Sequence, residues 1–349
     1  QTDPTAAARL LQATCKALWQ VSALKAKASV KEDQFRIWEE IANPGFGKLL
    51  KNVARVSGGR DFHFHEEMFI EFDQFSQALL SSALLRFCLT HNDYAAAAKC
   101  CEKGACFTKE QFAQINTHVR EEDRTSWLSN LLIVNTNDNR LDIVGLLLQS
   151  GVCTEAVQSS LRCAAQNGHE AVTKLLLDNG ANVAAANKDG WTALTVAAKC
   201  GHEAVTKLLL DHGADVAAGN KESFTALMAA ALGGHETVTE LLLDRGADVA
   251  AADINGKTAL MCAALGGHEE VTKLLLDNGA NVAAANKEGW TALMVAAIGG
   301  HEEVTKLLLD NGANPAAANK HGSTAVMVAS KGGHEAVTEL LKERDPGYW

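Results

Sequence analysis

The feature that most constrains this chain is a repeat of 33 residues. A Gly-His pair recurs six times at that interval, with its histidine at His169, His202, His235, His268, His301 and His334. The unit 301–333 is identical to the unit 268–300 at 27 of 33 positions. A unit this short cannot bury a core of its own, so repeats of this kind stack on their neighbours into an elongated array.

The first half of each unit has the signals of a short helix. In the unit that starts at His268, Thr291 is a predicted helix N-cap, and the pair Gly299–Gly300 ends that helix because glycine accepts a left-handed backbone. The stretch 313–323 in the next unit is predicted to be an extended loop with a turn at 320–322.

The second half of each unit predicts another helix. It begins at His301 and ends at Gly312, and Val304, Leu307 and Leu308 have the i, i+3, i+4 spacing of a buried stripe. Two helices and a loop are therefore expected in every unit.

The unit resembles the ankyrin repeat. The pattern of that family, from its turn glycine to its final Gly-Ala-Asp, appears here as Gly190, Thr192-Ala-Leu, Ala197-Ala198, Gly201-His202, Val205, Leu208-Leu209 and Gly213-Ala214-Asp215. The sequence departs from the pattern at two positions. Alanine replaces the family proline at Ala193, and the family histidine near the helix start is a threonine or a methionine. The resemblance implies an all-α, ankyrin-type solenoid with short β-hairpin-like loops.

Three regions are predicted along the chain. Residues 152–349 hold six regular repeats and a polar last helix that suits a terminal cap, and residues 76–151 hold degenerate repeats. In the latter, 139–151 matches a second helix, and a shortened loop is expected over 152–159. Residues 1–75 are predicted to form a helical N-terminal domain for which no family resemblance is evident.

Composition argues against several classes of protein. A net charge of −10 and a pI near 5.7 disfavour nucleic acid as a partner. No apolar run approaches the ~20 residues of a membrane span. The nine cysteines form no paired framework, which favours reduced thiols in an intracellular, cytoplasmic protein, with the nucleus also open.

The repeated histidines invite a metal hypothesis, which helix packing disfavours. Equivalent residues of stacked helices lie about 8–10 Å apart, whereas zinc ligands lie about 2 Å from the metal. The resemblance instead implies that these histidines tie neighbouring loops together by hydrogen bonds.

Two other sets of residues could hold a metal, but neither has a standard ligand spacing. They are the segment His63, His65 and Glu66, and the cluster Cys88, His91, Cys100, Cys101 and Cys106. No catalytic residue, metal or cofactor is predicted.

Variable positions within the nearly constant repeats are the candidate binding residues. Large apolar residues are expected to form one strip along the concave groove, and they are Trp191, Phe224, Leu232, Leu265, Trp290 and Ile298. Asp189, Glu222 and Glu288 would form its acidic edge and select basic residues on a partner helix or extended segment. A methionine recurs at positions 228, 261, 294 and 327, where packing between repeats is favoured over groove contact.

The predicted function is a non-catalytic scaffold that binds a partner protein. The alternative is an enzyme or adaptor whose N-terminal domain carries the activity while the repeats select the substrate. In that case Cys15, Cys88 and His63 are the first residues to test. The near-identity of the units also leaves a consensus-designed array open.

Overall fold

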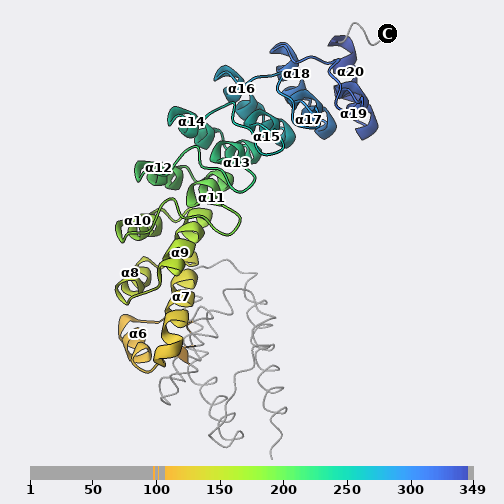
Figure 1. Cartoon of the computed structure of the whole chain (residues 1–349). Coiled ribbons are helices and arrows are strands. Elements are labelled where there is room, and N and C mark those ends of the chain that lie inside the picture. The colour runs from red at the N-terminus through yellow and green to blue at the C-terminus, as the bar shows by residue number, and fades with distance from the viewer. Residues whose placement is uncertain (1–96, 99–100, 102–106, 345–349) are drawn as a thin grey trace, which may run out of the picture. The chain divides into compact units, whose positions relative to one another are not determined.

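The computed structural model describes residues 97, 98, 101 and 107–344 (Figure 1). Fifteen helices and no strands occur among these residues, which agrees with the predicted all-α fold. The chain divides into two compact units, 1–134 and 135–349. The predicted N-terminal domain, 1–75, lies outside the described residues. None of the described helices is both long and apolar enough to cross a bilayer.

The described part of the first unit has an aromatic core. It contains α6 (Lys109–Asn116) and most of α7 (Glu121–Asn137). Phe112 stacks on Phe107 and on Trp127, with ring centroids 6.2 Å and 5.7 Å apart. The indole nitrogen of Trp127 donates a hydrogen bond to the carbonyl oxygen of Ala98 at 3.2 Å.

The second unit is a stack of helix pairs. The first helices are α9 (Thr154–Asn167), α11 (Ala193–Cys200), α13 (Ala226–Gly233), α15 (Ala259–Gly266), α17 (Ala292–Gly299) and α19 (Ala325–Gly332). The second helices are α8 (Leu141–Gln149), α10 (Glu170–Asp178), α12 (Glu203–Asp211), α14 (Glu236–Asp244), α16 (Glu269–Asp277), α18 (Glu302–Asp310) and α20 (Glu335–Arg344). First helices pack against first helices and second helices against second helices, which gives the two rows of Figure 1.

The predicted helix ends are confirmed, and their physical causes are visible. The hydroxyl of Thr291 accepts a hydrogen bond from the backbone nitrogen of Met294 at 3.4 Å. At the other end of α17, Gly300 has φ +72°, a conformation that costs a residue with a side chain. The stripe predicted on α18 needs a correction. Val304 and Leu308 are buried, but Leu307 is only half-buried and Thr305 is buried instead. Its hydroxyl donates to the His301 carbonyl at 2.7 Å, so its polar atom is satisfied inside the core.

The loop predicted over 152–159 is wrong. Helix α9 begins at Thr154, two residues after Val152, and continues for 14 residues. The later loops all contain an Asn or Asp that closes a turn, and this stretch has none at the matching place. Thr154-Glu155 instead begins a helix directly, with an acidic residue in its first turn.

The repeated methionines fill the interface between repeats, as favoured from the sequence. Met228, Met261 and Met294 are at most 1% exposed, whereas Met327 is 49% exposed. The difference follows from position. Helix α19 is at the end of the row of first helices, and nothing among the described residues packs on its far side.

Candidate functional site

The loops between repeats are short fingers, comprising residues 187–191, 220–224, 253–257, 286–290 and 319–323. Isolated antiparallel bridges close their bases, for example between Gly219 and Thr225. In the second finger, the side-chain oxygen of Asn220 accepts hydrogen bonds from the backbone nitrogens of Glu222 and Phe224, at 2.8 Å and 2.9 Å. The same paired bonds recur at Asn187, Asp253, Asn286 and Asn319. These residues were not among the predicted site residues, although an Asn or Asp recurs there at every 33rd position.

Main-chain hydrogen bonds join the fingers in a row. The backbone nitrogen of Lys221 donates to the carbonyl of Asp189 at 3.1 Å, and that of Ile254 donates to Glu222 at 2.9 Å. Equivalent bonds run from Lys287 to Asn255 at 2.7 Å and from Lys320 to Glu288 at 3.0 Å. The fingers therefore hold their side chains at fixed relative positions before any partner arrives.

The repeated histidines make the inter-repeat hydrogen bonds that the resemblance implied. Nε2 of His268, His301 and His334 lies 3.0–3.2 Å from the carbonyl oxygens of Leu232, Leu265 and Ile298 respectively. These carbonyls belong to three of the predicted binding residues. Histidine therefore fixes the backbone that presents each side chain. Among the described residues, no three His, Cys, Asp or Glu side chains gather as a metal site would require.

The predicted aromatic residues are divided by the structure. The rings of Trp191 and Phe224 lie 6.1 Å apart at an angle of 50°, and Nζ of Lys199 lies 5.3 Å from the Trp191 ring centroid. Lys257 occupies the next equivalent position and separates this pair from Trp290. The aromatic row is therefore a pair and a single residue.

The predicted aliphatic residues occupy the ends of neighbouring first helices. Leu232 is half-buried on α13, while Leu265 on α15 and Ile298 on α17 are 41% and 46% exposed. Ile254, which was not predicted as a binding residue, is 49% exposed at the tip of the third finger. The signal was available, because the other four fingers carry lysine at that position.

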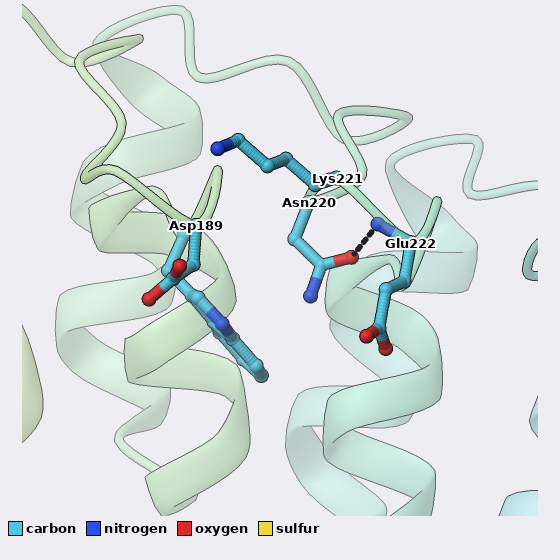
Figure 2. A pocket seen from close by; sticks show the side chains of 5 residues that line it. Asp189, Asn220, Lys221 and Glu222 are labelled. Atoms are coloured by element: carbon cyan, nitrogen blue, oxygen red, sulfur yellow. Dashed lines mark hydrogen bonds between the residues drawn. The ribbon is translucent and has the colours of Figure 1, made fainter.

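The acidic residues divide into two environments. Asp189 and Glu222, on adjoining fingers, line one hollow of about 380 Å³ (Figure 2). Its other lining residues are Trp191, Asn220 and Lys221. By contrast, Glu288 Oε1 lies 3.7 Å from Lys320 Nζ on the neighbouring finger.

The residues of the alternative hypotheses lie mostly outside the described residues. These are Cys15, His63, His65, Glu66, Cys88, His91, Cys100 and Cys106. Three of the described cysteines, Cys163, Cys200 and Cys262, are free thiols. Burial raises the pKa of Cys163, and it raises the pKa of Cys262 to about 12, which keeps that thiol protonated and unreactive at neutral pH.

Comparison with protein families gives one assignment for the array. A family model described as ankyrin repeats matches in three copies, over residues 130–220, 217–286 and 279–348. Together these segments cover more than half of the chain. A comparison with curated proteins gives no match.

Proposed function

The chain belongs to the ankyrin-repeat family, and we propose that its array is a scaffold that binds a partner protein without catalysing a reaction. The binding face would consist of the fingers and the exposed ends of the first helices, which we call the groove face. We also propose an intracellular, cytoplasmic location, in keeping with the free thiols.

The observation that carries this proposal is the distribution of exposed apolar side chains. Five large hydrophobic side chains of the described residues are more than 40% exposed, and three of them, Ile254, Leu265 and Ile298, lie on the groove face of adjoining repeats. The other two are Met327 on α19, the final helix of its row, and Leu141 at the start of α8. The exposed side of the second helices carries charged residues instead, as at Glu269 and Lys273 on α16. The three neighbouring apolar side chains on the groove face support a protein-binding role, because their desolvation favours association.

The fixed backbone of this face also favours binding. The finger-to-finger bonds and the histidine bonds order the loops in the free protein, so binding costs little additional conformational entropy. The partner would be a helix or an extended segment that follows the row of repeats.

Selection of random displayed peptides on the full-length protein tests the proposal. We expect enriched peptides whose affinity falls about tenfold or more with Leu265→Ser/Ile298→Ser, because two apolar contacts are lost. A matched variant of the second helices, Lys207→Gln/Lys273→Gln, should leave their affinity unchanged. The absence of enriched peptides, or equal loss in both variants, would contradict the proposal.

A further inference from the structure

The three acidic residues beside the apolar strip look equivalent in the sequence, but the structure separates them. Glu288 already has a cationic neighbour, Lys320, at 3.7 Å. Asp189 and Glu222 instead share the hollow between the first two fingers. The lining holds two carboxylates and one ammonium group, Lys221, while a second ammonium group, that of Lys199, lies over the Trp191 ring.

We propose that this hollow binds one arginine side chain of the partner protein, an inference that rests on the proposed function. A guanidinium is planar and weakly hydrated, it stacks on aromatic rings, and it has five N–H donors to share between carboxylates. The lining includes an aromatic ring on which a guanidinium can stack, that of Trp191, and carboxylates that can accept its N–H groups, those of Asp189 and Glu222. The volume of about 380 Å³ is near the lower end for ligand pockets, which suits one side chain.

The two walls of the hollow are joined by the backbone. The Lys221 nitrogen donates to the Asp189 carbonyl at 3.1 Å, and Asn220 holds the Glu222 nitrogen at 2.8 Å (Figure 2). The carboxylates therefore project from connected, ordered turns, and an arriving guanidinium does not have to organise them.

Two lysines compete with the arriving charge. Lys221 lines the hollow, and Nζ of Lys199 lies 5.3 Å from the centroid of the Trp191 ring. Removal of the Lys221 charge should therefore strengthen arginine binding. A merely structural role for the acidic residues would not produce that opposite effect.

The first finger pair differs from the other three in its acidic residues. The positions equivalent to Asp189 and Glu222 are Glu222 and Asn255 in the second pair, Asn255 and Glu288 in the third, and Glu288 and His321 in the fourth. Two carboxylates thus occupy these positions in the first pair alone. One arginine at this place would set the register of the partner segment, with the segment's apolar residues directed toward Leu265 and Ile298.

Titration of the full-length protein with N-acetyl-arginine methylamide tests the hollow by itself. The readout is the NMR signal of the Trp191 indole N–H, assigned by its loss in Trp191→Phe. We expect that signal to shift with the arginine compound and not with its uncharged citrulline analogue. The shift should vanish in Asp189→Asn/Glu222→Gln and persist in the matched variant Glu288→Gln. An equal response to arginine and citrulline would overturn the inference.

Selected peptides separate this inference from the proposed function. Arginine should recur in groove-dependent peptides, and its replacement by citrulline should weaken them about tenfold, as expected for a lost charge-assisted contact. Lys221→Gln should tighten the same peptides. Groove-dependent peptides that lack arginine and ignore Asp189→Asn/Glu222→Gln would overturn the inference while the proposed function stands.

Discussion

Nε2 of His268 lies 3.1 Å from the main-chain carbonyl oxygen of Leu232, 36 residues earlier in the chain. Because a carbonyl only accepts, the imidazole is the donor, and one repeat thereby ties down the first-helix end of the repeat before it. The same ring leaves no room for a Cβ atom at Gly234 of the preceding repeat, which explains why that position stays glycine.

Loss of this imidazole should destabilise the array locally. We expect His268→Ala to lower the free energy of unfolding by about 1–2 kcal/mol, since it removes a hydrogen bond and the packing around it. Urea denaturation followed by circular dichroism measures the change. His212→Asn is the matched control. The His212 side chain bonds to the Leu208 carbonyl at 2.8 Å, and at the equivalent position of the previous repeat Asn179 makes the same bond to Leu175 at 2.8 Å. Asparagine can therefore replace this histidine without losing the bond. Equal destabilisation by both variants would contradict the role given to His268.

Two glycines with similar backbones should respond differently to alanine. Gly234 and Gly246 have φ +72° and +84°. Alanine at either position would be held in a left-handed conformation, which lowers the free energy of unfolding by about 1 kcal/mol. Only at Gly234 would the new Cβ meet His268, whereas nothing lies within 4 Å of it at Gly246. Thermal unfolding should therefore show a clearly larger loss for Gly234→Ala, and equal losses would refute the steric explanation.

Position in the stack should decide the cost of losing a methionine. Met261 is 1% exposed and Met327 is 49% exposed. We expect Met261→Ala to cost about 2–5 kcal/mol, the range for a buried methionine that leaves a cavity, and Met327→Ala to cost well under half of that. Chemical denaturation of the two variants is the measurement. A similar loss at both positions would show that burial against the next repeat is not what stabilises Met261.

The Cys262 thiol should respond to alkaline pH. Its pKa is about 12 in the folded protein against an ordinary value of 9.0, so folding favours the protonated form. This contribution to stability is complete below pH ~9 and is lost as the pH rises toward 12. Cys262→Val, the residue present at the equivalent Val295, should therefore lose less stability than the parent protein between pH 8 and 10. Parallel pH profiles of the two proteins would contradict this assignment.

Thiol labelling offers a second test of the buried cysteine. At pH 8 the exposed Cys200 should react quickly with iodoacetamide, while Cys262 should react only after unfolding. Peptide mass spectrometry resolves the two sites. Rapid modification of Cys262 in the folded protein would show that its surroundings open readily.

The sequence by itself determined the array, because its signals are local and repeat. Thr291 begins a helix and Gly300 ends it through their own local preferences. The 33-residue period requires that neighbouring repeats stack on one another. The loop expected over 152–159 failed because a helix start at Thr154 competes there, which the pattern of the regular repeats could not reveal.

Only the tertiary structure decided which of several similar residues are available to a partner. Met261 and Met327 occupy the same slot of the repeat, and Glu222 and Glu288 the same finger position, yet their surroundings differ. Those surroundings are supplied by the adjoining repeat, 33 residues away, and for Met327 no described residue packs on that side. Local pattern therefore fixes the helices and turns, while contacts between repeats fix exposure, ion pairing and the hollow beside Trp191.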